Sequence, residues 1–244
     1  MSLRGRVAIV TGAAGRIGTA IVEDLCSRGM RVVVNDLDLH AANLLASRMV
    51  EAGFEAVANG GDIATHHGVA SILEQADGAW LLVNNAGAFY ASATVDLPEA
   101  EWDRAFNVDV KAAFLCSKAV LPGMLARMGG RIIVVSSIAG HIVRTGQIAY
   151  CAAKAAAIHF ARCLAVEYAS HGITVNCICP GVIKTHLSET LWKDEERLKL
   201  FLGRKSLGRI GDTEEIVGGA VYFASEASSF TTGAVLTIDG GMVI

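Results

Sequence analysis

The chain has 244 residues, of which 52% are hydrophobic and 18% are charged, and its formal net charge is −3 at pH 7. No linker rich in proline, serine or charge divides it, so we expect a single domain over residues 1–244. A near-neutral charge without a basic block argues against a nucleic-acid partner and a polybasic membrane surface. The longest uncharged stretch, 78–95, is interrupted by polar residues and does not predict a membrane helix.

The first residues and the cysteines indicate the compartment. Residues 1–10 do not resemble a signal peptide, because their apolar stretch is short and leads into a glycine turn, so we expect a cytoplasmic protein. The six cysteines form no C-x-x-C pair, and His66-His67 lacks convergent ligands, so we expect neither disulfides nor a metal site. The charged fraction lies below the roughly 25% usual for soluble domains, which favours burial of surface between subunits.

Short β-branched stretches alternate with longer amphipathic stretches along the chain. Strands are predicted at 7–10, 32–34, 56–58, 81–83, 132–135, 173–175 and 235–238. Helices are predicted at 17–29, 38–52, 66–76, 99–127, 149–170 and 213–225. Such near-continuous apolar strands are typical of parallel sheets buried on both faces. The alternation predicts an α/β fold, a doubly wound, Rossmann-type three-layer sandwich with a seven-stranded, mostly parallel sheet.

The segment 182–211 breaks this alternation, because it is long and carries a charged run at 193–197. We interpret it as a lid over a substrate site, and a solvated helical excursion fits the charge pattern equally well. In a doubly wound sheet, ligands bind beyond the carboxyl ends of the strands, where the strand order reverses. Residues that carry the chemistry should therefore follow the strands.

The first predicted strand leads directly into the glycine-rich sequence TGAAGRIG at 11–18, which an amphipathic helix follows. Glycines let the backbone approach a pyrophosphate, and the free N–H groups at a helix start favour its negative charge. We therefore predict a dinucleotide site here, with a tight turn that binds nothing as the alternative. The predicted contacts are Gly12, Ala14, Gly15, Arg16, Ile17 and Gly18.

Asp36 ends the second predicted strand, 18 positions after Gly18, close to the spacing at which a carboxylate binds an adenosine ribose. A carboxylate there would also repel a 2′-phosphate, so NAD is favoured over NADP. Two alternatives stay open. Asp36 and Asp38 could instead begin a helix, and the cation of Arg16 could tolerate the extra phosphate of NADP.

Tyr150 and Lys154 are four residues apart on a predicted helix, so both side chains lie on one face. A phenol has a reference pKa of about 10, and a nearby ammonium favours its ionised form. Such a pair can take a proton from a secondary alcohol or give one to a carbonyl oxygen. An exposed helical pair is the alternative. Ser137 follows the strand at 132–135 and can reach the tyrosine, with Ser136 as the competing residue.

These motifs resemble the short-chain dehydrogenase/reductase family, in its compact single-domain branch, over essentially the whole chain. Further motifs stand in family order at Asp62-Ile63, Asn84 to Gly87, Asn107, Pro180-Gly181, Thr232-Gly233 and Asp239 to Gly241. One departure is the glycine spacing G-x-x-G-x-x-G, because the compact branch usually has T-G-x-x-x-G-x-G. This departure affects the expected pyrophosphate position and the choice between NAD and NADP.

The resemblance implies roles for individual residues. Tyr150 is the expected general acid/base, Lys154 also holds the nicotinamide ribose, Ser137 binds the reacting oxygen and Asn107 holds a water that leads to Lys154. The further implied cofactor contacts are Asp62, Ile63, Asn85, Ala86, Gly87, Pro180, Gly181, Ile183 (or Val182) and Thr185. Weaker substrate candidates are Ser137, His141, Gln147 and Tyr150, with Tyr90 and Ser92.

We therefore expect an oxidoreductase that transfers a hydride between NAD(H) and a secondary alcohol, polyol or sugar and the matching ketone. The alternatives are an NADP(H)-dependent reductase of the 3-oxoacyl carrier protein type and an inactive nucleotide-sensing protein. The resemblance further implies a homotetramer or homodimer, in which the helices near 99–127 and 149–170 pair across a two-fold axis.

Overall fold

The computed structural model describes residues 3–185, 188–203 and 206–243. Seven strands form one sheet in the order β3-β2-β1-β4-β5-β6-β7, and every neighbouring pair is parallel. The strands are β1 Val7–Thr11, β2 Arg31–Asn35, β3 Ala56–Asn59, β4 Ala79–Asn84, β5 Gly130–Val135, β6 Ile173–Pro180 and β7 Val235–Ile238. The predicted α/β fold is confirmed, and the order reverses between β1 and β4.

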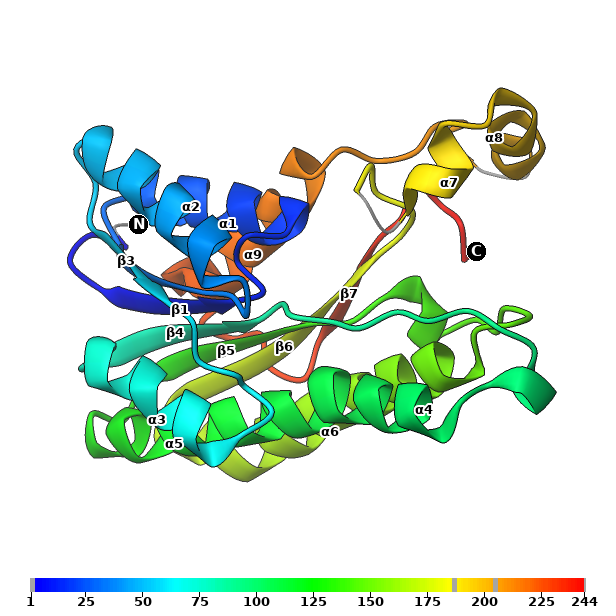
Figure 1. Ribbon diagram of the computed structural model, residues 1–244. Helices are drawn as coiled ribbons and strands as arrows, with labels where there is room; N and C mark the ends of the chain where they lie inside the picture. Colours follow the sequence, from blue (N-terminus) through cyan, green and yellow to red (C-terminus); the bar gives the residue numbers. More distant parts are fainter. Residues whose placement is uncertain (1–2, 186–187, 204–205, 244) are drawn as a thin grey trace.

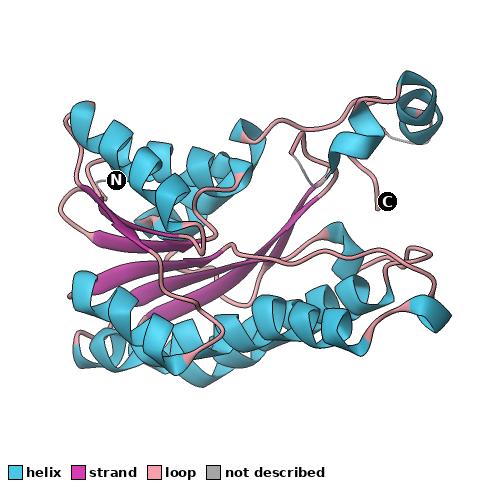
Figure 2. Cartoon of the chain, viewed as in Figure 1, coloured by secondary structure: helices cyan, strands magenta, loops and turns pink. Residues whose placement is uncertain are grey.

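Helices cover both faces of the sheet, giving three layers (Figures 1 and 2). One face carries α1 Arg16–Ser27, α2 Leu39–Glu51 and α9 Glu214–Ala224, and the other carries α3 His66–Gln75, α4 Glu99–Phe106, α5 Ala112–Ala126 and α6 Ile148–Tyr168. A separate cluster of buried apolar side chains fills each interface between sheet and helices. Short 3₁₀ turns lie at η1 Thr94–Asp96, η3 Ile138–Gly140, η4 Ala169–His171 and η6 Glu226–Ser228.

The helix predicted at 99–127 is interrupted by a π-helical turn, η2 Asn107–Lys111, between α4 and α5. The N–H of Ala112 donates to the carbonyl oxygen of Asn107, five residues back. Such turns occur in proteins mostly as single insertions and often at functional sites. This one begins at Asn107 and contains the buried Asp109.

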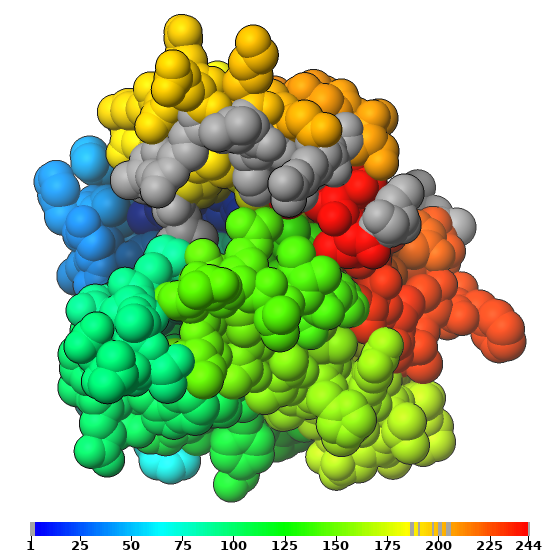
Figure 3. Space-filling view, turned by 90° about the vertical axis from the view of Figure 1, so that its right-hand side faces the viewer, coloured from blue at the N-terminus to red at the C-terminus, as the bar shows by residue number. Residues whose placement is uncertain are grey.

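Strand β6 continues five residues beyond the predicted segment 173–175. The polar Asn176 is buried, and it is satisfied because its Nδ2 donates to Thr231 O and its Oδ1 accepts from Ala234 N. After β6 the chain forms α7 Glu189–Trp192 and α8 Glu195–Leu202. Figure 3 shows this yellow segment above the green residues, on the face to which the carboxyl ends of the strands point.

Within the described residues, one helical stretch, Ile148–His171, is long and apolar enough to cross a membrane, with a mean hydropathy of 1.2. It contains α6, which packs against β6 and the other helices of its layer. An apolar helix of this kind is equally typical of a protein core.

Candidate active site

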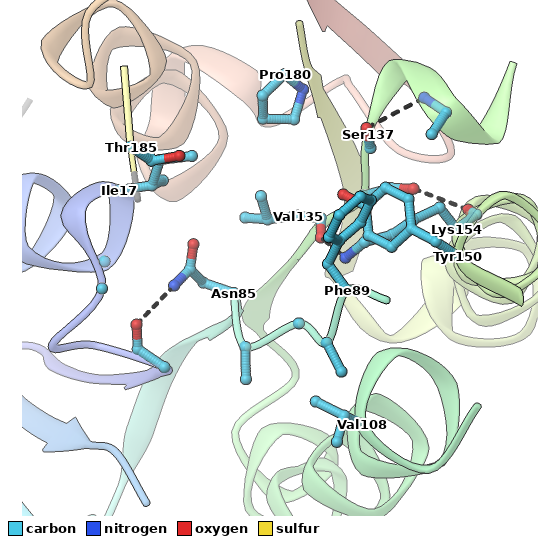
Figure 4. Close-up of a pocket in the computed structure, with 18 of the residues that line it drawn as sticks. Ile17, Asn85, Phe89, Val108, Val135, Ser137, Tyr150, Lys154, Pro180 and Thr185 are labelled. Atoms are coloured by element: carbon cyan, nitrogen blue, oxygen red, sulfur yellow. Dashed lines mark hydrogen bonds between the residues drawn. The ribbon is translucent and has the colours of Figure 1, made fainter. Parts of the chain in front are cut away.

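A pocket of about 890 Å³ opens at the carboxyl ends of the strands, where the sheet order reverses (Figure 4). Its wall comes from the loops after β1, β2, β3, β4, β5 and β6 and from α6. The sequence-predicted residues in this wall are Gly12, Gly15, Arg16, Ile17, Gly18, Asp36, Asp62, Ile63, Asn85, Ala86, Gly87, Ser137, Gln147, Tyr150, Lys154, Pro180, Gly181, Val182, Ile183 and Thr185. Segments far apart in the sequence therefore meet at one pocket.

Several predicted residues are not part of the described wall. Asn107 begins the π-helical turn, and its neighbour Val108 lines the pocket instead. His141 is exposed on the loop after η3. The N–H of Ala14 donates to Asp36 Oδ2 at 3.0 Å, so Ala14 supports a wall residue. Tyr90 and Ser92 also lie outside the wall, although the residues beside them, Phe89 and Ala91, line it.

The glycine loop fits a dinucleotide phosphate. Gly12 has φ +58°, and a Cβ there would lie 2.7 Å from the Cα of Ala86. A Cβ at Gly18 would collide with the carbonyl oxygen of Gly12, whereas at Gly15 it would meet the same oxygen at 3.3 Å. Gly15 begins α1 without a side-chain cap, so the N–H groups of the first turn can bind an anion. The unusual spacing, with Arg16 opening the helix, leaves this cradle intact.

Asn85 ties the end of β4 to the glycine loop. Its Nδ2 donates to the carbonyl oxygens of Thr11 at 3.0 Å and Gly12 at 2.9 Å. The hydroxyl oxygen of Thr11 accepts from the N–H groups of Asn85 and Ala86 at 3.1 and 3.2 Å. The two loops at the reversal point therefore form one hydrogen-bonded unit.

Asp36 and Asp38 have different roles in the fold. Asp38 caps α2, because its Oδ1 accepts from the N–H of Ala41 at 3.0 Å. Asp36 is not the helix cap. Its carboxylate accepts from the N–H groups of Ala14 and Asp38 at 3.0 and 3.1 Å and lines the pocket beside the glycine loop.

Ser136 and Ser137 are separated by their hydrogen bonds. Both serines line the pocket, but the buried Ser136 hydroxyl donates to the carbonyl oxygen of Lys154 at 2.8 Å and is held against α6. The Ser137 oxygen accepts from the N–H of Ala139 at 3.1 Å, so its hydroxyl hydrogen can still be donated into the pocket (Figure 4). The geometry favours Ser137 over Ser136 as the hydroxyl that meets a ligand.

Tyr150 and Lys154 lie on α6 at the end of the pocket that Ser137 occupies (Figure 4). The Tyr150 ring packs edge-on against Phe89, with centroids 5.1 Å apart, and the Lys154 ammonium lies 5.7 Å from the centre of the Tyr150 ring. Lys154 Nζ is 2.8 Å from Asp109 Oδ1 and donates to Val135 O at 3.3 Å. Burial lowers the pKa of Lys154, but Asp109 and Tyr150 outweigh burial and raise it.

Sequence reasoning missed two kinds of residue in this region. Asp109 is a charged residue between Val108 and Val110 in a helical stretch, and this was a usable signal. The pocket wall also includes Arg104, from α4, and Arg144, from the loop before α6. No sequence motif marks these two, because their position depends on how the loop and helix pack.

Comparison with known proteins gives full-length matches. Residues 12–243 match the family model described as Enoyl-(Acyl carrier protein) reductase. The 3-oxoacyl-(acyl-carrier-protein) reductase of Vibrio harveyi is 36% identical over 243 residues, which cover 99% of both chains. The 5-keto-D-gluconate 5-reductase of Escherichia coli is 33% identical over 247 residues, which cover 100% of this chain and 97% of that enzyme.

A solved structure extends this similarity to three dimensions. The gluconate 5-dehydrogenase from Burkholderia cenocepacia, in complex with NADP and tartrate, superposes with a TM-score of 0.94 at 30% identity. The match covers 99% of this chain and 96% of that one. The relatives are oxidoreductases, so the chain is an enzyme, and the alternative of a nucleotide-sensing protein without turnover is dropped.

Proposed function

Since the chain belongs to the short-chain dehydrogenase/reductase family and is an oxidoreductase with a nicotinamide cofactor, we propose that it interconverts a secondary alcohol of a polyol or sugar and the matching ketone, with NAD(H). One observation carries the proposal. Ser137, Tyr150 and Lys154 meet at one end of a pocket whose other end is a phosphate-binding glycine loop. The experiment is a screen of secondary alcohols and sugars with NAD+ and NADP+, followed at 340 nm.

Each residue of the reacting end has a distinct task in this proposal. The nicotinamide, when bound, supplies or accepts the hydride. Tyr150 gives a proton to the carbonyl oxygen during reduction and takes one from the hydroxyl during oxidation. The Lys154 ammonium stabilises the ionised phenol, and Ser137 donates a hydrogen bond to the reacting oxygen. Asn107, in the π-helical turn, is proposed to hold a water on the path to Lys154.

The preference for NAD over NADP rests on Asp36. Its carboxylate lies beside the glycine loop, where it can accept hydrogen bonds from a ribose and would repel a 2′-phosphate. Two observations favour NADP instead: the cation of Arg16 in the pocket wall, which could pair with a 2′-phosphate, and the NADP in the Burkholderia gluconate 5-dehydrogenase. The test is the melting temperature with each dinucleotide, because a ligand that binds only the folded state stabilises it by about 2.7 kcal/mol at 100 times its Kd. A larger shift with NADP+ would reverse the assignment.

We also propose that the preferred substrate carries a carboxylate. Arg104 and Arg144 bring positive charge to the pocket wall, although Arg104 also pairs with Glu101 at 3.3 Å. The acidic residues of the described wall, Asp36 and Asp62, follow β2 and β3. A guanidinium pairs well with a carboxylate. The proposal agrees with the names of two relatives, which act on keto-gluconate and gluconate. The test compares a sugar acid with a neutral polyol of the same chain length, and equal kcat/KM would contradict it.

A second candidate is an NADP(H)-dependent 3-oxoacyl carrier protein reductase. The observation that favours it is the 36% identity to the Vibrio enzyme over 243 residues. The arginines of the pocket wall would also suit the phosphate of a pantetheine arm. A 3-oxoacyl thioester offered with NADPH separates the two candidates. Turnover of that thioester at a higher kcat/KM than any sugar or sugar acid would establish the second one.

The assembly and the lid are further parts of the proposal. We propose a cytoplasmic single-domain enzyme that forms a homotetramer or homodimer through α5 and α6, which expose Phe114 and Val166. The segment 182–211 is proposed as the substrate lid, because Thr185, Ser188 and Leu191 line the pocket. His186 and Leu187 of this segment lie outside the described residues.

A further inference from the structure

A buried carboxylate lies against the ammonium of Lys154, outside the residues that the sequence patterns assign. Asp109 lies in the π-helical turn, its side chain is 0% exposed, and its Oδ1 is 2.8 Å from Lys154 Nζ. Its other oxygen, Oδ2, accepts from the backbone N–H of Ala88 at 3.4 Å. The carboxylate therefore links the segment after β4 to helix α6.

The backbone at Gly87 lies close to both groups of this ion pair. A Cβ at Gly87 would lie 2.9 Å from Asp109 Oδ1 and 3.1 Å from Lys154 Nζ, so a larger residue would press on both charges. A second cavity of about 10 Å³, roughly the space of one water, is lined by Thr11, Asn84 and Asp109 among others. Asp109 thus contacts the ammonium and also lines this small cavity, most of whose other lining residues are apolar.

The ion pair also orients the ammonium. An ammonium has three N–H groups. In the described structure, Lys154 Nζ donates to Val135 O and lies in an ion pair with Asp109 Oδ1, and Lys154 also lines the pocket. A buried lysine held from two sides keeps its charge at a defined distance from Tyr150.

We propose that Asp109 is a positioning residue, whose carboxylate holds the Lys154 ammonium in place and sets the pH range in which the Tyr150–Lys154 pair transfers its proton. The inference rests on the proposed function, because it assumes that this pair moves the proton.

The charged and titratable groups around Lys154 define the electrostatics. Among the described residues these are Asp109 from the π-helical turn, Tyr150 from α6 and Cys177 from β6. Burial lowers the pKa of Lys154, but Asp109 and Tyr150 raise it further than burial lowers it. The hydrogen bond with Cys179 and burial raise the pKa of Cys177, so this thiol stays neutral. Asp109 therefore supplies the negative charge that balances the ammonium.

Removing this charge has a predictable sign. Loss of a nearby anion makes every neighbouring group release its proton at lower pH. Because the charges of Tyr150 and Lys154 interact, we expect loss of the Asp109 anion to shift proton transfer by the pair toward acid, whichever group loses the proton. Alcohol oxidation needs the pair with one proton removed, and carbonyl reduction needs the fully protonated pair. Both pH limits should therefore move toward acid.

The experiment compares Asp109→Asn with the wild type, as pH profiles of kcat/KM in both directions. We expect the acid limb of oxidation and the basic limb of reduction to move down by about one pH unit or more, with a lower kcat. Asp103→Asn is the matched control, because it removes the same charge from an exposed position on neighbouring α4. Limbs that stay in place in Asp109→Asn, even with reduced activity, would show a merely structural role and overturn the proposal.

A second measurement needs neither turnover nor a folded Asp109 variant. Lysines labelled with ¹³C at Cε are observed by NMR, and Lys154 is assigned as the resonance missing from Lys154→Arg. In the wild type its shift should remain that of an ammonium up to a pH of about 10. A titration midpoint below a pH of about 9 would overturn the proposal. Failure of the proposed function would instead appear as absent turnover with a normal Lys154 spectrum.

Discussion

At the scale of single residues, the hydroxyl of Tyr150 can be separated from the ring that carries it. The ring packs edge-on against Phe89, so Tyr150→Phe keeps this contact and removes the proton donor. General acid–base catalysis contributes about 10²- to 10⁴-fold, and we expect kcat to fall within or beyond that range. The measurement is turnover at 340 nm, with the melting temperature and its shift by dinucleotide as controls. A kcat within about tenfold of the wild type would contradict the assignment.

The two aspartates after β2 give a matched test of cofactor choice. Asp36→Asn removes the negative charge beside the glycine loop, and the ratio of the Kd for NADP+ to that for NAD+ should fall by about tenfold or more. Asp38→Asn is the control, because asparagine caps a helix about as well as aspartate does. Titration by calorimetry or protein fluorescence measures both ratios. An equal change in the two variants would mean that Asp36 acts only through net charge.

At the scale of elements, the sequence predicts helices and strands with a regular residue pattern, and it misses the places where that pattern is interrupted. The seven strands were predictable because β-branched residues cluster in them, and the glycine loop because its residues have a definite order. The π-helical turn was not predictable, because it has no composition of its own and residues 99–127 have the pattern of one continuous helix. Strand β6 was predicted too short, because Asn176 and Cys179 conceal a buried strand whose polar atoms find partners only in the fold.

The site divides in the same way. Tyr150, Lys154 and Ser137 have a fixed spacing in the sequence and could be predicted to share one region. Arg104 and Arg144 reach the pocket wall through tertiary packing, which no local pattern reports. Asp109 has a local signal, a charge between two valines, but the sequence does not show that it lies against Lys154.

The glycine loop gives a prediction about the β1–α1 connection as a unit. A Cβ at Gly18 would meet backbone atoms of Gly12 and Ala13, which cannot move independently, whereas at Gly15 it would meet a single oxygen at 3.3 Å. Gly18→Ala should lower the free energy of unfolding by about 1–3 kcal/mol and weaken dinucleotide binding. Gly15→Ala should have a smaller effect on both. Urea unfolding measures the stability of the two variants, and thermal shift with NAD+ measures their dinucleotide binding. Equal losses of stability in Gly18→Ala and Gly15→Ala would contradict the described loop.

At the scale of the whole molecule, helix α6 is more apolar than the described chain needs for its own core. Its 18-residue apolar window is 44% buried, and Val166 on it is 85% exposed. We therefore expect Val166→Lys to weaken the proposed assembly, which sedimentation velocity measures as a shift to smaller species. Val95→Lys is the control, because Val95 is 89% exposed and lies on η1, which is not part of α5 or α6. A wild-type protein that sediments as a monomer would refute the assembly. Equal effects of Val166→Lys and Val95→Lys would mean that the interface does not depend specifically on α6.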